Sequence, residues 1–410
     1  MKYIEPAKEI DVFGEYDVIV VGGGVAGLTS AIASARNNAK TLLVEQFGYL
    51  GGTATASLMI NINGFRNQVE PDSTQTVKGI AQEIILELHK MNGLGKSPYQ
   101  QKEYDIEKEL SYSYCIDPEK FKYVTLKLVH ESGVDILFHT YFSDVIKEGK
   151  ELKGIIVENK SGRGALFAKV TVDASGDGDV SARAGVPFWQ ASSTDNALKD
   201  NIMYKISGIG EAEFGNCRYS DSSVVWGPGS VWGQNDAWEI SRAEVKTRLE
   251  IFKHFQSILD KNPKLKEAGA YVAETPPLIG IRQTRFIEGE YKLTADDAIT
   301  GRRFEDVVAI SSCPIISYYG YRRYLEHEGY DIPYRCLVPK YVDNLLISGR
   351  CISSEQQPYE SHRAMAPIMA IGEASGVSAA LSANNNVKPR NLDVSILQET
   401  LIKQGAELRK

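Results

Sequence analysis

The chain has 410 residues, of which 43% are hydrophobic and 24% are charged, and its formal net charge is −7. This composition is that of an ordinary folded protein, and the length predicts two domains or one domain with a large insertion. The negative balance argues against an extended nucleic-acid surface, so we expect no nucleic-acid partner.

The cysteines and the N-terminus bear on metal binding and location. The five cysteines include no C-x-x-C pair, so we expect no metal site and reduced thiols in a cytoplasmic protein. Residues 1–6 lack the basic start and apolar stretch of a secretion signal, and we expect no membrane association.

The segment Tyr16–Glu45 organises the rest of the chain. It begins with a β-branched apolar run, Asp17–Val21, typical of a strand buried on both faces of a parallel sheet. The glycines of Gly22–Gly27 then fit G-x-G-x-x-G, which permits a tight turn and close approach of a pyrophosphate. A helix over Leu28–Asn37, a strand over Thr41–Val44 and the acid Glu45 follow. This order predicts a dinucleotide site, with Glu45 accepting hydrogen bonds from a ribose.

The uncharged stretch Val18–Ala35 also has the length of a transmembrane helix. Three consecutive glycines, Asp17 just before the stretch and small residues throughout favour a buried strand–helix unit instead. A second glycine turn lies in Phe47–Thr55, directly after the ribose acid, where a bare backbone permits close approach of the same ligand.

Further elements follow in order. The apolar spacing of Val77–Met91 predicts an amphipathic helix. Asp117 and Pro118 are typical of an N-cap and first helical residue, with the helix closing at Gly133 and a strand over Val134–Phe138. Three β-rich runs from Phe142 to Val172 predict an antiparallel meander, which ends in the small and acidic residues 173–179. These return the chain to the nucleotide or form an acidic surface turn.

Residues 190–335 change character. Three tryptophans spaced six apart (Trp226, Trp232, Trp238) line a ligand pocket or pack a small sheet. Ser241–Glu244 matches a capping box and predicts a helix over Arg242–Lys261, with Val245, Leu249, Phe252 and Leu259 on one broad face. Two arginines in Gly280–Arg285 and six tyrosines between Tyr318 and Tyr334 form a pocket wall or a subunit contact.

The C-terminal part returns to the pattern of the start. A buried strand is predicted over Asn344–Ser348, followed by a turn at Gly349–Cys351. A helix of small residues begins at Ala366–Pro367, and such a helix can lie flat against a cofactor with its N-terminus directed at it.

These blocks together resemble the FAD-dependent oxidoreductase family of glutathione-reductase-type fold, which is distantly related to fumarate reductase flavoproteins. The resemblance implies an α/β fold: a Rossmann-like FAD-binding domain with a three-stranded meander (1–189 and 336–410) and an inserted α+β substrate domain (190–335). The chain has Gln356 where family members tend to carry a histidine. His362, Arg363, Tyr318 and Arg282 are therefore the candidate catalytic residues, and a histidine satisfied in the core is the alternative for His362.

The resemblance also implies FAD as cofactor, held along a path from the first glycine turn to the C-terminal helix. The residues implied to bind it are Gly22, Gly24, Val25, Ala26, Gly27, Glu45, Gln46, Gly51, Gly52, Thr53, Phe142, Ala174, Gly176, Asp179, Gly349, Arg350, Met365 and Pro367.

The function implied is hydride transfer between a small organic substrate, anionic or polar, and flavin N5. Arg282, Arg285 or Arg363 would orient the anionic group, and structural ion pairing is their alternative role. An NAD(P)-dependent dehydrogenase, a flavin monooxygenase and a flavin-carrying binding protein remain open, as does a homo-oligomer. A single nucleotide motif and the absence of a redox cysteine pair predict reduction by the organic substrate rather than by NAD(P)H.

Overall fold

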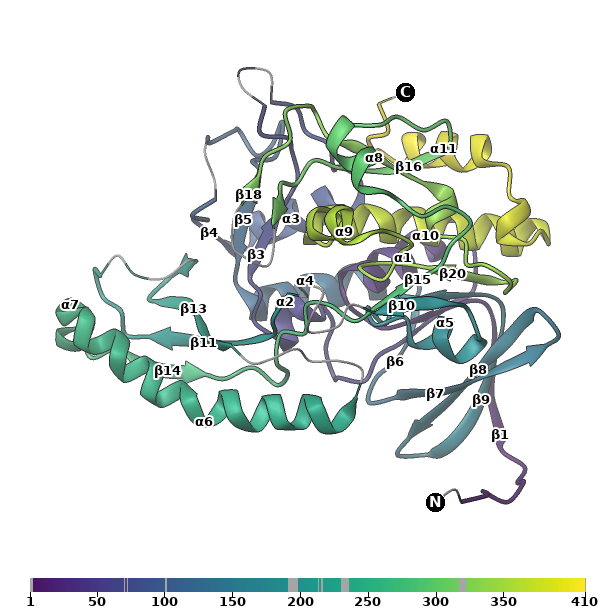
Figure 1. Cartoon of the computed structure of the whole chain (residues 1–410), viewed down its shortest axis with the longest axis horizontal. Coiled ribbons are helices and arrows are strands. Elements are labelled where there is room, and N and C mark those ends of the chain that lie inside the picture. The colour runs from purple at the N-terminus through teal and green to yellow at the C-terminus, as the bar shows by residue number, and fades with distance from the viewer. Residues whose placement is uncertain are drawn as a thin grey trace.

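The computed structural model describes residues 3–69, 71, 73–99, 102–190, 198–212, 214, 217–229, 236–316 and 322–409. Its centre is a mixed sheet of seven strands in the order β6-β2-β1-β9-β8-β7, with β20 also paired to β9 (Figure 1). The strands are β1 (Asp11–Val21), β2 (Thr41–Val44), β6 (Asp135–Leu137), β7 (Tyr141–Glu148), β8 (Glu151–Asn159), β9 (Gly162–Asp173) and β20 (Leu345–Ile347).

The first strand–turn–helix–strand unit has the predicted order with different bounds. β1 pairs in parallel with β2, and helix α1 (Val25–Arg36) connects them. β1 begins at Asp11, before the predicted start, because residues 11–16 pair with residues 164–168 of β9. α1 begins three residues before the predicted Leu28, because the last residues of the glycine motif form its first turn. The stretch proposed as a membrane alternative is thus a buried strand and helix.

The predicted antiparallel meander is confirmed as β7, β8 and β9. It is continuous with the parallel part of the sheet, because the 12-residue β9 also pairs in parallel with β1 and β20. The architecture is therefore mixed α/β with a parallel-containing central sheet. Its glutathione-reductase-type details stay a prediction.

Helix α10 (Met365–Asn385) packs directly on α1, as its small residues allow. A β-carbon at Gly372 would lie 2.3 Å from the Ala26 carbonyl oxygen, and one at Gly376 would lie 2.1 Å from that of Ser30. The Thr29 hydroxyl donates to the Met369 carbonyl at 3.0 Å across the same contact. Glycine at these positions lets the two backbones touch, which fixes α10 beside the nucleotide turn.

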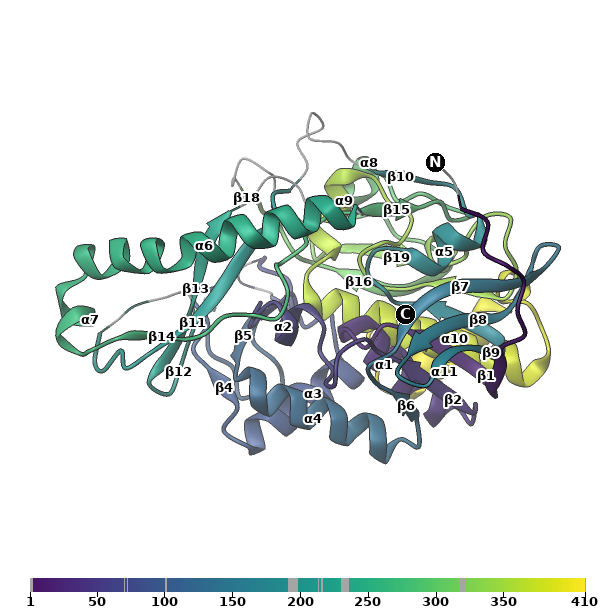
Figure 2. The same cartoon turned by 90° about the horizontal axis from the view of Figure 1, so that it is seen from below.

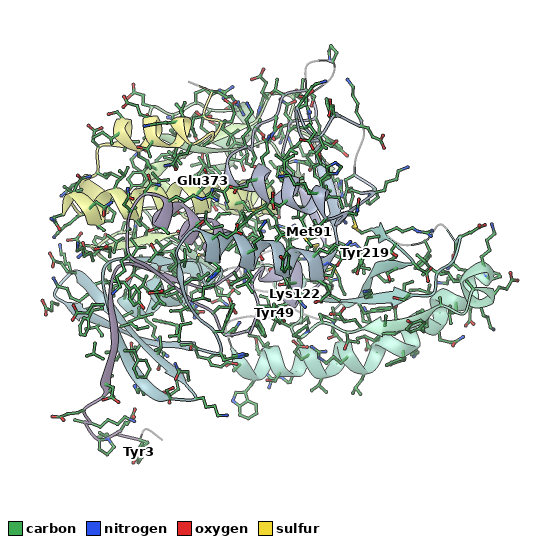
Figure 3. All side chains as sticks on the ribbon, turned by 180° about the vertical axis from the view of Figure 1, so that it is seen from behind. Tyr3, Tyr49, Met91, Lys122, Tyr219 and Glu373 are labelled. Carbon is green, nitrogen blue, oxygen red and sulfur yellow. A yellow bond between two sulfur atoms is a disulfide. The ribbon has the colours of Figure 1, made fainter. Side chains whose placement is uncertain are left out.

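Helices α3 (Ile80–Lys90) and α4 (Pro118–Glu131) lie beside each other and match two predicted helices. α3 starts later than predicted, because Gly79 adopts a φ of +61° and the buried Glu373 carboxylate accepts from the Ile80 amide at 3.0 Å. The predicted N-cap of α4 is confirmed: Asp117 accepts from the Glu119 amide at 2.9 Å. Glu373 is labelled on α10 in Figure 3.

A second, smaller core lies at one end of the molecule (Figures 1 and 2). We call the described residues between 198 and 282 the cap. Its four-stranded sheet has the order β12-β13-β11-β14, covered by α6. The elements are β11 (Asn201–Ser207), β12 (Arg218–Tyr219), β13 (Ser222–Gly229), α6 (Ala237–Lys261), α7 (Pro263–Glu267) and β14 (Tyr271–Glu274).

Helix α6 corrects two predictions. It begins at Ala237 with Asp236 as N-cap, which accepts from the Glu239 amide at 2.9 Å, so the predicted capping box at Ser241 is wrong. Its buried face carries Ala243, Thr247, Ile251 and Phe255. The predicted apolar face is mostly exposed, with Val245 at 60%, Leu249 at 79% and Phe252 at 67% exposure.

The remaining elements join these parts. Apolar residues of 304–334, inside the predicted insertion, pack in the larger core, whereas the predicted domain boundaries themselves stay a prediction. The remaining strands are β3 (Asn61–Asn63), β4 (Leu94–Gly95), β5 (Ser113–Ile116), β10 (Phe188–Gln190), β15 (Arg285–Ile287), β16 (Val307–Ser311), β17 (Ile315–Ile316), β18 (Arg322–Arg323) and β19 (Tyr330–Pro333). The remaining helices are α2 (Thr53–Ala56), α5 (Asp179–Ala184), α8 (Ala295–Thr300), η1 (Tyr334–Cys336), α9 (Gln356–His362), η2 (Pro389–Asn391) and α11 (Val394–Lys403).

The prediction that all five cysteines are reduced thiols is wrong. Cys115 on β5 and Cys217 just before β12 form a disulfide, with Cα atoms 5.6 Å apart. The other three cysteines are buried free thiols. The two bonded residues are 102 positions apart in the chain, so only the docking of the cap against β5 brings them together.

Membrane-span criteria single out one pair of helices. Within the described ranges no single helix is long and apolar enough to cross a membrane. α9 and α10 meet the length and composition criteria only as a pair, and the chain bends by 95° between them.

Candidate functional site

One cavity of about 810 Å³ runs from the glycine turn after β1 to the cap. Residues of the first turn, of Gly52–Thr53, of Tyr141–Ser143 on β7 and of the loop after β9 border one part of it. Asn201, Met203 and Leu278–Arg282 of the cap border another part. The cavity therefore joins the predicted nucleotide site to the segment predicted to bind substrate.

The first glycine turn is shaped by three different constraints. Gly22 has a φ of +100°, and a β-carbon there would lie 2.6 Å from the Ala174 carbonyl oxygen. A β-carbon at Gly27 would lie 1.7 Å from the Gly22 carbonyl, so Gly27 permits close helix packing and does not border the cavity. At Gly24 a β-carbon would meet only the Gly52 Cα, at 3.8 Å. The Gly24 side is thus open to a ligand, beside first-turn amides of α1 that lack intrahelical acceptors.

Glu45 ends β2 at the cavity wall with only 6% of its surface exposed. One carboxylate oxygen accepts from the Gly23 amide at 2.6 Å and the other from the Phe47 amide at 2.8 Å. Burial raises the pKa of Glu45, although these amide hydrogen bonds oppose the shift. The side chain holds the glycine turn to the end of β2, and its ribose contact stays a prediction.

The second glycine turn docks against the first. The Gly51 amide donates to the Gly23 carbonyl at 2.9 Å, so Gly51 acts through its backbone and does not border the cavity. Gly52 and Thr53, at the start of α2, do border it. The two turns together form one wall, as their positions in the sequence suggested.

The loop after β9 is held by arginines from distant segments. Arg285 contacts the Asp179 carboxylate at 2.7 Å, and Arg350 forms an ion pair with Asp177. Burial, reinforced by Asp177 and Asp173, raises the pKa of Asp179 to about 6. Asp177 and Asp179 are therefore ion-paired with arginines and do not form a free acidic surface turn.

The start of α10 forms the C-terminal part of the wall. Gly349, Arg350, Met365 and Ile368 border the cavity. Pro367 is buried in the first turn of α10 and does not border it, contrary to its predicted cofactor contact. Of the implied FAD-binding residues, the cavity is bordered by Gly22, Gly24, Val25, Ala26, Glu45, Gln46, Gly52, Thr53, Phe142, Ala174, Gly176, Asp179, Gly349, Arg350 and Met365.

The candidate catalytic residues separate into three groups. Arg282 and Arg363 border the cavity. His362 does not: it is fully buried, its Nε2 lies 3.1 Å from the Ser354 hydroxyl, and burial together with Arg363 lowers its pKa to about 3. A neutral histidine enclosed in the core suits packing, so we withdraw its catalytic role. Tyr318 lies outside the described residues.

Several residues that border the cavity were not predicted from the sequence. Asn201 and Met203 come from β11, and Ser57 and Met59 follow α2. None belongs to a recognisable motif, and isolated polar and apolar residues carry no signal of their position. Of the three tryptophans, Trp226 lies beside Arg282, Trp238 is 76% exposed, and Trp232 lies outside the described residues.

The sequence profile of the family described as FAD dependent oxidoreductase matches residues 17–224 and 211–401. The chain belongs to this family. FAD is accordingly its cofactor, and the chain is an FAD-dependent oxidoreductase. The site fits FAD, because the open Gly24 side and the α1 amides offer a pyrophosphate both room and donors.

Individual relatives of this FAD-dependent oxidoreductase cover different shares of it. A thiamine thiazole synthase of Aeropyrum pernix is 31% identical over 231 residues, which is 48% of this chain and 73% of that protein. An aerobic glycerol-3-phosphate dehydrogenase of Staphylococcus haemolyticus is 24% identical over 194 residues, 35% of each protein. The structure of a geranylgeranyl bacteriochlorophyll reductase-like protein from Thermoplasma acidophilum has a TM-score of 0.50 at 16% identity, covering 96% of this chain and 84% of that one. This last likeness concerns the fold alone.

Proposed function

We propose that this protein transfers a hydride between a small organic substrate and FAD, with the substrate held between the cap and the cofactor. The observation that carries the proposal is the continuity of the cavity from the Gly24 turn to Asn201, Met203 and Arg282 of the cap. When bound, FAD supplies the hydride-transfer chemistry at flavin N5.

The chain's residues would hold the cofactor along the cavity wall. Backbone amides at Gly24 and in the first turn of α1 would donate to the pyrophosphate, Glu45 would accept from the adenosine ribose, and the backbone at Phe142 would lie near the adenine. The first turn of α10, at Met365, would direct its positive helix end at the flavin pyrimidine. This arrangement corresponds to the glutathione-reductase type of FAD domain.

We further propose that the organic substrate, and not NAD(P)H, reduces the cofactor. The G-x-G-x-x-G motif of Gly22–Gly27 is the only such strand–turn–helix unit predicted in the chain. The disulfide cysteines Cys115 and Cys217 do not border the cavity, which gives no support to a disulfide-reductase mechanism.

The test is an anaerobic screen of the holoenzyme against compound classes, following loss of the flavin absorbance. We expect saturable bleaching by one class of organic reductant, or reoxidation of the reduced protein by the matching oxidised compounds. If no organic compound changes the redox state of the flavin in either direction while NADPH or NADH does, the proposal is wrong.

A further inference from the structure

Five arginines border the cavity, and they differ in how their charge is balanced. Arg285 and Arg350 are paired with Asp179 and Asp177, and Arg183 is exposed to solvent. Arg282 and Arg363 are half-buried, and the described carboxylates include none within ion-pair distance of either guanidinium. These two arginines are the ones whose charge still needs an anion.

Contacts from three sides hold the pair in place. Arg282 donates from Nη2 to the Asn201 side-chain oxygen at 2.9 Å, and its guanidinium carbon lies 5.2 Å from the Trp226 ring centre. The Tyr359 hydroxyl donates to the Arg282 carbonyl, and the Arg363 guanidinium carbon lies 6.0 Å from the Tyr359 ring centre. Tyr359 therefore fixes the segments that carry both arginines.

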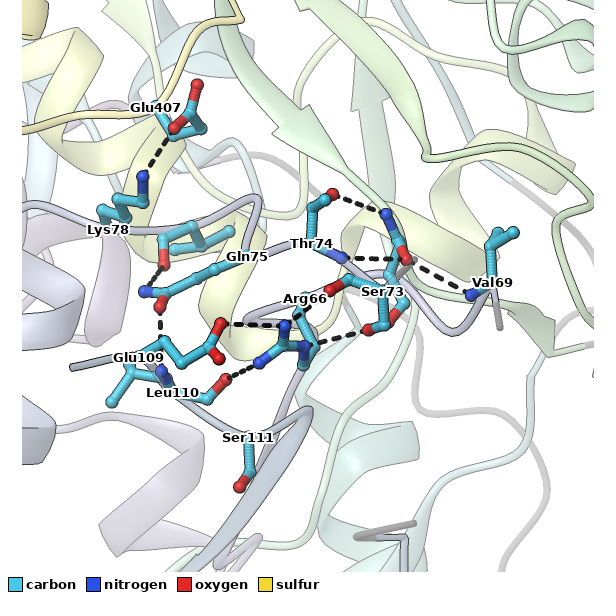
Figure 4. Close-up of polar contacts among 12 residues, drawn as sticks. Arg66, Val69, Ser73, Thr74, Gln75, Lys78, Glu109, Leu110, Ser111 and Glu407 are labelled. Carbon is cyan, nitrogen blue, oxygen red and sulfur yellow. Dashed lines mark hydrogen bonds and ion pairs between the residues drawn. The ribbon is translucent and has the colours of Figure 1, made fainter. Parts of the chain in front are cut away.

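Arg363 lacks the partners that a structural arginine has. Its Nε is buried without a hydrogen-bond partner, and no side-chain hydrogen bond links it to any other described residue. Arg66, by contrast, is 2% exposed and donates to the Leu110 carbonyl at 2.8 Å, to both oxygens of Ser73 and to Glu109 (Figure 4). Arg285, Arg350 and Arg409 also have a buried Nε without a partner, but each of them donates from Nη to another residue, and Arg363 does not.

The charged groups around the two arginines indicate the sign of the charge that a ligand should carry. Burial, reinforced by Arg363, lowers the pKa of Arg282 to about 10, so Arg282 stays positive at neutral pH. Of the neighbouring acids, Asp200 accepts from the Arg282 backbone amide at 3.0 Å. Glu360 accepts from Gln356 at 3.0 Å, and burial raises its pKa. Arg282 and Arg363 therefore stand close together with no ion-paired carboxylate among the described residues, which favours an anionic ligand between them.

We infer that Arg282 and Arg363 together bind the carboxylate of the substrate, which is a small organic acid with an apolar body. The assignment rests on the proposed function. A planar carboxylate matches guanidinium donors in pairs, and its negative charge offsets the positive charge of the two arginines. Met203, Ile279 and Ile281 border the same part of the cavity and offer an apolar surface to the rest of the molecule.

The experiment titrates the holoenzyme with phenylacetate and with its neutral amide, phenylacetamide, at constant ionic strength. Binding is followed by the flavin spectrum and by the thermal midpoint, and inorganic phosphate is a third probe. We expect saturable binding of phenylacetate and at least tenfold weaker binding of phenylacetamide.

Four variants then assign the binding to the arginines. Arg282→Gln and Arg363→Gln should each weaken phenylacetate at least tenfold while FAD content stays unchanged. Arg363→Lys should lie between wild type and Arg363→Gln, which guards against a mere folding defect. Arg242→Gln, on the cap helix α6 with 71% of its side chain exposed, removes the same charge from a residue that does not border the cavity and should bind like wild type.

Equal binding of acid and amide, unchanged affinity in both glutamine variants, or tighter binding of phosphate than of phenylacetate would overturn the assignment. Loss of FAD from the glutamine variants would overturn it too, by assigning the arginines to the cofactor. Failure of the proposed function is distinguishable: phenylacetate would still bind through the arginines, but no organic compound would change the flavin's redox state.

Discussion

Gly24 offers a substitution that separates cofactor binding from folding. Its backbone angles, φ −66° and ψ 178°, are ones that any residue adopts, and a β-carbon there would have its nearest neighbour at 3.8 Å. Gly22 and Gly27 lack this freedom, because a β-carbon at either would overlap a backbone carbonyl. In Gly24→Val the side chain would project into the cavity, where the pyrophosphate must come within about 3 Å of the amides.

The expected magnitudes differ between the two properties. Replacing a glycine whose backbone angles suit any residue stabilises a protein by about 0.4–1 kcal/mol. Valine is a poorer N-cap residue than glycine, which costs about 1 kcal/mol. The free energy of unfolding should therefore change by less than about 1 kcal/mol. Overlap with the phosphates should weaken FAD at least about 100-fold, or about 2.8 kcal/mol.

The assay measures flavin absorbance per protein after purification, and the thermal midpoint with and without added FAD. The thermal midpoint of the wild type should rise when FAD is added. The midpoint of Gly24→Val should be the same with and without added FAD, because the variant does not bind it. Gly229→Val is the matched control, since a β-carbon there would have its nearest neighbour, the Asp200 carbonyl oxygen, at 3.7 Å. A folded Gly24→Val protein with the full flavin content of the control would refute the assignment of this turn.

Three further predictions concern the fold. In denaturant without reductant, three of the five cysteines should react with a thiol reagent, and five reactive thiols would contradict the disulfide. Reduction of Cys115–Cys217 should lower the free energy of unfolding by about 2–4 kcal/mol. Burial raises the pKa of Glu373 to about 7 from 4.5, so the native state binds the extra proton and wild type should lose stability as pH rises through this window, by at most about 3 kcal/mol. Denaturant unfolding at pH 5 and pH 8 should show a smaller loss for Glu373→Gln, and equal losses would exclude the residue as the cause. Asp117→Ala should cost about 1 kcal/mol through loss of the α4 N-cap, and an unchanged denaturation midpoint would contradict that role.

Local signals in the sequence were enough to predict several elements of the fold. β2, the meander and the start of α4 follow from apolar runs, turn residues and the Asp117 cap, each of which acts within a few residues. The start of β1 could not be predicted, because its extension depends on pairing with β9. For α6 the predicted cap at Ser241 lies inside a helix whose N-cap is Asp236, and the apolar stripe that suggested burial is mostly exposed.

The residues of the candidate site also divide into those that a local motif predicts and those that only distant contacts bring into place. The glycine turns and Glu45 carry a motif, and the structure brings them to one cavity. His362 was a catalytic candidate because Gln356 stands where family members tend to carry a histidine, but the side chain of His362, at the end of α9, is buried in the core. Asn201 and the Cys115–Cys217 bond depend on how the cap docks, and no short-range pattern encodes that contact.

Anaerobic rapid mixing of the holoenzyme tests the proposed reaction most directly. The flavin is followed after mixing with an organic substrate found in the screen and, separately, with NADH and NADPH. We predict fast, saturable bleaching by the organic substrate and only slow, non-saturating change with either nicotinamide. Rapid, saturable bleaching by NADH or NADPH at micromolar concentrations would contradict the account and assign the protein to the nicotinamide-dependent flavoenzymes.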